Sequence, residues 1–195
     1  MGYKAFTSLA ATGLLAVALL TGTADASPNL AVNGGFEAAD FSGWTLTGDT
    51  GDADVADNPA LAFSGSYYAA FGPTSGPVTI TSAPITTVVG DEYDLSQAID
   101  SSGLSIGTVA VGVNGSPIDT LSTGPGDTTF TVSGSVLTAT STSTVVSYTI
   151  NDPDSTVNLD GISFTAVPEP ATIALFGLGL AGLAFAGRRR RSRKS

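Results

Sequence analysis

Between residues 27 and 166, apolar residues alternate with polar ones in several short runs that turn residues interrupt. Residues 109–113 alternate in this way, and Asn114-Gly115 follows them as a favoured two-residue hairpin turn. Residues 129–132 and 146–150 repeat the pattern. A period of two is typical of strands, and no long stretch of this region has the 3.6-residue period of a helix. The sequence therefore predicts an all-β domain of about eight to ten short strands, arranged as a two-sheet sandwich.

The charged residues are divided unevenly along the chain. All Lys and Arg residues lie at Lys4 or after Gly187, and the region between them carries only acidic charge. Such a region repels phosphate backbones, which excludes a nucleic-acid partner. The chain has no Cys and no His, so it lacks disulfides, thiol nucleophiles, imidazole bases and the usual zinc ligands. A glycosidase needs only two carboxylates, but residues 27–166 contain no basic side chain to orient them, and we expect a protein that is not an enzyme.

The first 26 residues have the three parts of a secretory signal peptide. Lys4 gives a positive start, an apolar stretch from Ala5 to Leu20 follows, and an Ala-Asp-Ala site ends the segment. A core helix is the alternative, but such a helix is seldom followed at once by a cleavage pattern and strand-like sequence. We expect signal peptidase to hold Ala24 and Ala26 in its small pockets and to cleave after Ala26, which leaves Ser27 as the first residue.

A second apolar segment, Ala171 to Gly187, lies near the end of the chain. Its roughly 17 uncharged residues would form a helix about 25 Å long, at the lower limit for spanning a bilayer. Arginines follow from residue 188 onward, and basic flanks of this kind stay in the cytoplasm. Pro168 and Pro170 hold the chain extended on both sides of Glu169. The predicted topology is an exported domain anchored to the inner membrane by a single C-terminal transmembrane helix.

The Pro-Glu-Pro tripeptide, the apolar segment and the basic tail stand in the order of a PEP-CTERM sorting signal, which residues 167–195 resemble. The resemblance implies a Gram-negative host that exports exopolysaccharide, and an exosortase, a membrane-embedded protease, that processes the tail near Pro168, Glu169 and Pro170. After processing, the protein would reach the cell surface or the extracellular matrix. The same tail has also been labelled an ice-binding-protein C-terminal domain.

The two ends of the middle domain carry a second resemblance. The stretch NLAVNGGFE, closely followed by FSGW, opens the domain at residues 29–44, and NLDGISF closes it at residues 158–164. Both are similar to the first and last strands of carbohydrate-binding jelly rolls of the CBM4/9/22 or galactose-binding-like type. That resemblance implies a jelly-roll sandwich and a structural Ca²⁺ held by Glu37 and Asp160. Gly161 departs from the pattern, because a second Asp is usual there, and one candidate ligand is lost with it.

The residues themselves also favour a cation at Asp160. Strict alternation places Asp160, Ile162 and Phe164 on one face of a strand, so the carboxylate would lie at the rim of the core. The domain has no Lys, Arg or His to neutralise it, and Ca²⁺ is a cation that carboxylate oxygens bind well. The alternative is that Asp160 is exposed or caps backbone N–H groups.

Aromatic residues that could stack on a sugar are few. The stretch from Ser64 to Tyr68 resembles the third strand of the same carbohydrate-binding modules. Tyr67 and Tyr68 face opposite sides of a strand, so one of them is a candidate platform, whereas Trp44 is expected in the core. The sequence favours an exported, non-catalytic surface or matrix protein associated with exopolysaccharide and biofilm. A carbohydrate-binding module is the alternative, and ice binding through threonines of residues 138–144 is a weaker one.

Overall fold

The computed structural model describes residues 27–101, 107–123, 129–153 and 155–168, together with Gly179 and Gly182. The strands of these residues are β1 (Trp44–Gly48), β2 (Ala53–Asp57), β3 (Tyr67–Phe71), β4 (Val78–Ser82), β5 (Ile85–Thr86), β6 (Glu92–Ser101), β7 (Gly107–Val113), β8 (Ser116–Thr123), β9 (Thr131–Thr138), β10 (Ser143–Thr144), β11 (Val146–Asn151) and β12 (Val157–Ala166).

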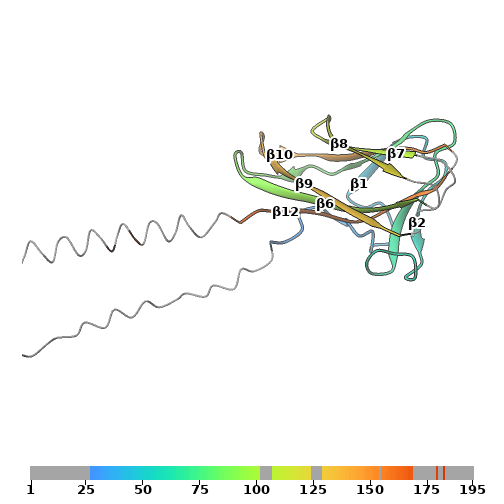
Figure 1. Ribbon diagram of the computed structural model, residues 1–195, viewed down its shortest axis with the longest axis horizontal. Coiled ribbons are helices and arrows are strands. Elements are labelled where there is room, and N and C mark those ends of the chain that lie inside the picture. The colour runs from blue at the N-terminus through green and yellow to red at the C-terminus, as the bar shows by residue number, and fades with distance from the viewer. Residues whose placement is uncertain are drawn as a thin grey trace, which may run out of the picture.

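Two five-stranded antiparallel sheets face each other and form a jelly-roll sandwich (Figure 1). The first sheet has the order β1-β4-β11-β7-β8, and the second has the order β2-β3-β12-β6-β9. A small ribbon of β5 and β10 lies beside them. The predicted all-β, two-sheet jelly roll is therefore confirmed.

The facing sides of the two sheets carry the core. Phe36, Phe71, Tyr148 and Phe164 are among its largest fully buried side chains. Trp44 also belongs to the core, as predicted, and its ring centroid lies 6.3 Å from that of Tyr148. Burying each such side chain stabilises the fold by about 1.5–3 kcal/mol relative to exposing it.

The β7–β8 hairpin forms where the Asn-Gly dipeptide predicts it. Asn114 has a φ of 51° and Gly115 has a φ of 79°, the left-handed conformations of a type I′ turn. Val109 and Val111 are buried, as their alternation requires. The Asn114 side chain also accepts a hydrogen bond of 2.8 Å from the N–H of Val145, which ties the turn to the neighbouring strand.

The last strand, β12, contains a bulge at Gly161 that breaks its alternation. The pairing with β6 shifts directly after Asp160, and Gly161 has a φ of 58°. Leu159 faces the core before the bulge and Ile162 faces it afterwards, three positions apart instead of two. The prediction that Asp160 shares a face with Ile162 and Phe164 is therefore wrong, because the extra residue turns Asp160 to the outer face of the second sheet.

The opening stretch of the domain fills the gap beside this bulge. The Leu30 N–H donates to the Phe164 carbonyl at 2.8 Å. The Asn29 amide donates to the Ile162 carbonyl at 2.8 Å and accepts from the Phe164 N–H at 2.9 Å. A Cβ at Gly34 would collide with the carbonyl oxygen of Ile162. The opening and closing motifs are thus two halves of one structure, and both ends of the domain emerge side by side (Figure 1).

Gly161→Ala is expected to destabilise the domain by about 2 kcal/mol or more. A left-handed conformation costs a residue other than glycine about 1–2 kcal/mol, and the new Cβ would also lie 2.8 Å from the Phe63 ring. Gly115→Ala is the matched control, because its φ is 79° but no atom lies within 4 Å of the added Cβ. Urea unfolding of both variants measures the difference in stability. Equal losses would show that the close contact with the Phe63 ring adds nothing to the cost of the left-handed conformation.

Several predicted segments lie outside the described residues: the signal peptide with Ala24 and Ala26, the sorting residues Glu169 and Pro170, and the apolar segment 171–187 apart from its two described glycines. Over the ranges that the structure describes, no helix is long and apolar enough to cross a membrane. β12 ends at Ala166, and the Val167 N–H donates to the Glu92 carbonyl at 2.9 Å. The sheet therefore continues almost to Pro168.

Candidate carboxylate pair and ligand-binding face

The structure brings Glu37 and Asp160 together at the loop that connects β2 to β3. Glu37 Oε1 accepts hydrogen bonds from the N–H groups of Ser66 at 2.9 Å and Tyr67 at 3.0 Å. A Cβ added at Gly35 would lie 3.7 Å from Asp160 Oδ1 and 3.8 Å from Glu37 Cγ. Only a glycine therefore separates the two acidic side chains, which come from opposite ends of the domain.

Asp160 is fully buried beneath the β2–β3 loop, although it lies on the outer face of its sheet. Its Oδ2 accepts from the Ser64 N–H at 3.0 Å, and its Oδ1 accepts from the Gly161 N–H at 2.6 Å. Burial raises the pKa of this carboxyl, backbone N–H donors oppose that rise, and the negative charge of Glu37 adds to it. Asp160 therefore caps backbone N–H groups and also faces a second acid.

The chemistry of this pair fits a hard cation. No Lys, Arg or His occurs between residues 27 and 166 to neutralise the two acids. Two N–H bonds use both lone pairs of Glu37 Oε1, but Glu37 Oε2 accepts only the longer bond from Ser66 and keeps a lone pair for a ligand. Ca²⁺ takes about six to eight oxygens, including backbone carbonyls and water. Within the described residues no group of three or more acidic, His or Cys side chains could hold a metal, so carbonyl and water oxygens would complete the shell.

The two predicted ligand-binding tyrosines point to opposite sides of β3, and neither is exposed. Tyr67 is half-buried and packs against the core. Tyr68 lies on the outer face of the second sheet with 7% of its surface exposed. Burial raises the pKa of Tyr68, and the charge of Asp100 raises it further. Neither ring offers an open platform for a sugar in this arrangement.

An exposed aromatic ring lies instead at Phe63, in the β2–β3 loop. The side chain is 46% exposed. One edge of its ring lies against Gly161, 2.8 Å from the position that a Cβ would take. Phe130, just before β9, approaches it edge-on with a centroid distance of 5.8 Å. Because Gly161 has no side chain, the Phe63 ring packs directly against the backbone on the outer face of the second sheet.

Apolar and polar groups surround this ring. Val132 of β9 is 57% exposed and pairs with Ala98 of β6. Asn158 and Asp100 pair across β12 and β6, and the Asn158 amide donates to Asp100 Oδ1 at 3.0 Å. We call Phe63, Phe130, Val132, Asp100 and Asn158 the Phe63 face. It joins an exposed apolar ring to a hydrogen-bonded polar pair, each member of which is 7% exposed.

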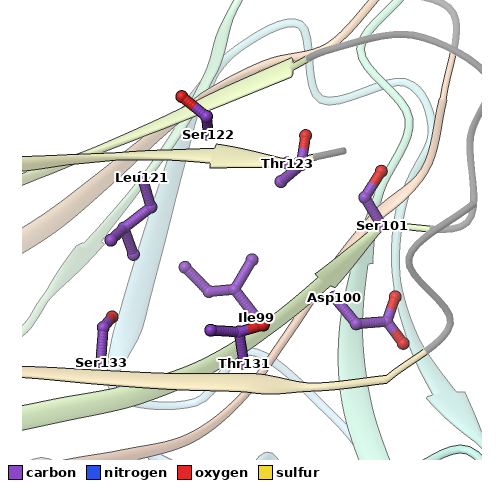
Figure 2. Close-up of a pocket in the computed structure, with 8 residues that line it drawn as sticks. All are labelled: Ile99, Asp100, Ser101, Leu121, Ser122, Thr123, Thr131 and Ser133. Carbon is purple, nitrogen blue, oxygen red and sulfur yellow. The ribbon is translucent and has the colours of Figure 1, made fainter. Parts of the chain in front are cut away.

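A slot opens between the two sheets at the edge that β8 and β9 form. β8 ends the first sheet and β9 ends the second, and a cavity of about 100 Å³ lies between them. Figure 2 shows the residues that line it, which are Ile99, Asp100, Ser101, Leu121, Ser122, Thr123, Thr131 and Ser133.

The threonines considered for ice binding do not form a ladder on one strand. β9 ends at Thr138, and β10 begins only at Ser143. Thr144 is buried, and its hydroxyl lies 3.0 Å from that of Thr87. A regular row of exposed hydroxyls is therefore not formed by residues 138–144.

Residues 166–191 match the PEP-CTERM protein-sorting motif, which confirms the first predicted resemblance. The match indicates an exported protein that is processed at its C-terminus. A comparison with curated proteins gave no match.

Solved structures of other proteins share the fold. The carbohydrate-binding module TmCBM61, solved in complex with β-1,4-galactotriose, has a TM-score of 0.61 and 18% identity, over 73% of this chain and 100% of that chain. The CBM22-1 xylan-binding domain of Paenibacillus barcinonensis Xyn10C has a TM-score of 0.54 and 15% identity, over 75% of this chain and 99% of that chain. A Stig cyclase of Fischerella sp. TAU has a TM-score of 0.54 and 17% identity, over 74% and 99%. These identities show the fold alone, and that fold serves binding modules and enzymes alike.

Proposed function

We propose that this protein is an exported, non-catalytic carbohydrate-binding module that its C-terminal signal directs to the cell surface or the extracellular matrix. The observation that carries the proposal is the Phe63 face, where an exposed ring rests on Gly161 near the hydrogen-bonded Asp100 and Asn158. The sorting motif at residues 166–191 supports export. The likeness of the fold to modules that bind galactotriose and xylan supports the class of ligand.

The chemistry of the Phe63 face suits a sugar chain. The flat Phe63 ring complements the C–H side of a pyranose, and Phe130 extends the apolar surface. Asp100 and Asn158 lie on the same face but are each only 7% exposed, so the exposed ring supplies most of the proposed contact. The chain carries a formal net charge of −10, which repels acidic polymers. The proposed ligand is therefore a neutral polysaccharide of the exopolysaccharide matrix.

Phe63→Ala is expected to weaken polysaccharide binding at least tenfold, which corresponds to about 1.4 kcal/mol. Affinity electrophoresis of the mature protein in gels that contain galactan, xylan or the host's own exopolysaccharide measures the effect. Phe63→Trp should retain binding, because it keeps a flat ring. Val89→Ala, which changes an exposed apolar residue of the β5–β6 turn, is the matched control. Retention of none of these polymers, or equal retention of the Phe63→Ala variant, would exclude the proposed face.

A further inference from the structure

A chain of hydrogen bonds runs from the centre of the core to the slot between β8 and β9. The buried Tyr148 hydroxyl donates to Gln97 Oε1 at 3.3 Å, and Gln97 Nε2 donates to Ser133 Oγ at 2.7 Å. Gln97 is only 3% exposed and stands between the two sheets. Burying an amide is unfavourable unless it is hydrogen-bonded, so a hydrophobic side chain would serve a purely structural core at least as well.

The direction of these hydrogen bonds determines whether Ser133 is a donor or an acceptor toward the slot. Burial raises the pKa of Tyr148, so its hydroxyl stays protonated and donates. Because Gln97 Oε1 accepts that proton, its Nε2 is the donor to Ser133. The Ser133 oxygen is then an acceptor toward Gln97, and its own proton points elsewhere. Ser133 lines the slot, across from Leu121 (Figure 2), so it offers an O–H donor there.

The opposite end of the slot is closed by two buried hydroxyl residues, since Ser101 and Thr123 are 0% and 5% exposed. The Thr123 hydroxyl lies 3.3 Å from Asp152 Oδ2, to which it donates, and it accepts from the Gly107 N–H at 3.0 Å. The Ser101 hydroxyl also points to this buried carboxylate, at 3.5 Å. The Ser101 oxygen also lies 2.9 Å from Ser155 Oγ, so both hydroxyls are bonded within the protein and fix the geometry of this end of the slot.

Apolar walls connect the two polar ends. Ile99 of β6 and Leu121 of β8 face each other across the slot, and Thr131 lies beside Ile99 (Figure 2). The carboxylate of Asp100 points away from Ile99 and Leu121 in the same view. The slot thus combines the Ser133 hydroxyl, the exposed Thr131 hydroxyl and apolar walls, which match the hydroxyl groups and C–H faces of a sugar ring.

We infer that this slot is a second binding site, which accepts one uncharged polyhydroxy ring of pyranose size. Its volume of about 100 Å³ is smaller than the roughly 150 Å³ cavities that hold a benzene ring, so one edge of the sugar ring enters the slot and the rest projects into solvent. The inference takes its ligand class from the proposed function. A free monosaccharide and the end residue of a polysaccharide share this chemistry.

The test is a titration of the ¹⁵N-labelled mature protein with glucose, galactose and mannose, and with linear oligosaccharides of the same sugars. We expect saturable shifts of the amide signals of residues 99–101, 121–123 and 131–133. Leu121→Trp fills the slot and should abolish these shifts. Ser133→Ala removes the donor and should weaken binding about fivefold or more, whereas Ser135→Ala, two residues farther along the same face of β9, should not. Thermal unfolding confirms that each variant is folded.

The outcomes distinguish a free monosaccharide from the end of a polysaccharide, and the slot from the Phe63 face. Shifts with monosaccharides identify a free-sugar site, and shifts with oligosaccharides alone identify a chain-end site. The absence of saturable shifts with every sugar, or unchanged binding by the Leu121→Trp variant, overturns the inference. Phe63→Ala distinguishes the sites, because it should remove retention by polysaccharide gels and leave the slot titration unchanged.

Discussion

Replacing Pro168, Glu169 and Pro170 with three alanines is expected to leave export intact and to trap a full-length, membrane-bound protein. The predicted signal peptide at residues 1–26 is unchanged, so translocation should proceed, and the predicted membrane segment 171–187 with its basic flank should still halt it. The sequence predicts an extended chain at Glu169, because a proline stands on each side of it, and an extended backbone is what a protease active site binds. The wild-type protein should instead lose the apolar segment and the arginines and reach the surface or the matrix.

The fold supports such a cut without damage to the domain. β12 ends at Ala166, and Val167 is still held by the Glu92 carbonyl, so cleavage at the tripeptide leaves the sheet complete. Mass spectrometry of the membrane and matrix fractions measures the outcome. Pro28→Ala is the matched control, because it removes a proline at the same end of the domain but outside the tail. Matrix protein that retains peptides from Arg188 onward, or equal release of the triple-alanine form, would show that the tail is only an anchor.

The parts of the fold that follow from local sequence could be predicted. Alternation over residues 109–113 and the Asn-Gly turn after it depend on neighbouring residues alone, and the hairpin forms as expected. The pairing of Glu37 with Asp160 was accessible only through resemblance to a family, because the two residues lie at opposite ends of the domain. Their roles as metal ligands remain a prediction.

The bulge at Gly161 shows where local reasoning fails. A period of two assumes an unbroken strand, and one residue with a φ of 58° reverses the face of every later position. The sequence held one signal of this, a glycine where the related modules have an acid. Glycine is the residue that adopts such a conformation without strain.

The binding surfaces depend on contacts between distant segments, which no local pattern reveals. Phe63 stands alone among turn residues, and its place over Gly161 requires the β2–β3 loop to cross β12, as the bond from Ser64 to Asp160 shows. Alternation over residues 129–132 predicts a strand that includes Phe130, but it does not predict the contact with Phe63. The slot requires β8 and β9 to be the edges of facing sheets, and the order of strands in a sheet is not encoded in any one segment.

Calcium is expected to stabilise the mature protein by roughly 2.7 kcal/mol when free Ca²⁺ is about 100 times the dissociation constant. The physical reason is the unneutralised pair of Glu37 and Asp160, which only Gly35 separates. A bound ion would join the opening stretch, the β2–β3 loop and β12, three segments far apart in sequence. Thermal unfolding with Ca²⁺ and with a chelator measures the effect.

The pH dependence of stability should differ between the protein in Ca²⁺ and the protein in chelator. In chelator, the folded protein holds the Asp160 proton more tightly than the unfolded chain does, because the pKa is raised above its usual 3.8 by burial and, to a lesser extent, by Glu37. That contribution to stability is fully present below the unfolded pKa and is lost as the pH rises through the folded pKa. Bound Ca²⁺ requires the ionised carboxylate, so the stabilisation by calcium should grow over the same interval and be largest at neutral pH.

Two variants and one control test which acids are responsible. Asp160→Asn and Glu37→Gln should each blunt or abolish the rise in melting temperature that Ca²⁺ produces. The rise itself must be compared, because an amide at residue 160 cannot accept from both the Ser64 and Gly161 N–H groups and costs stability without any metal. Asp54→Asn, which neutralises an exposed acid of the same sheet, should leave the response unchanged. Identical unfolding curves at neutral pH with Ca²⁺ and with chelator would mean that the paired acids serve only to cap backbone N–H groups.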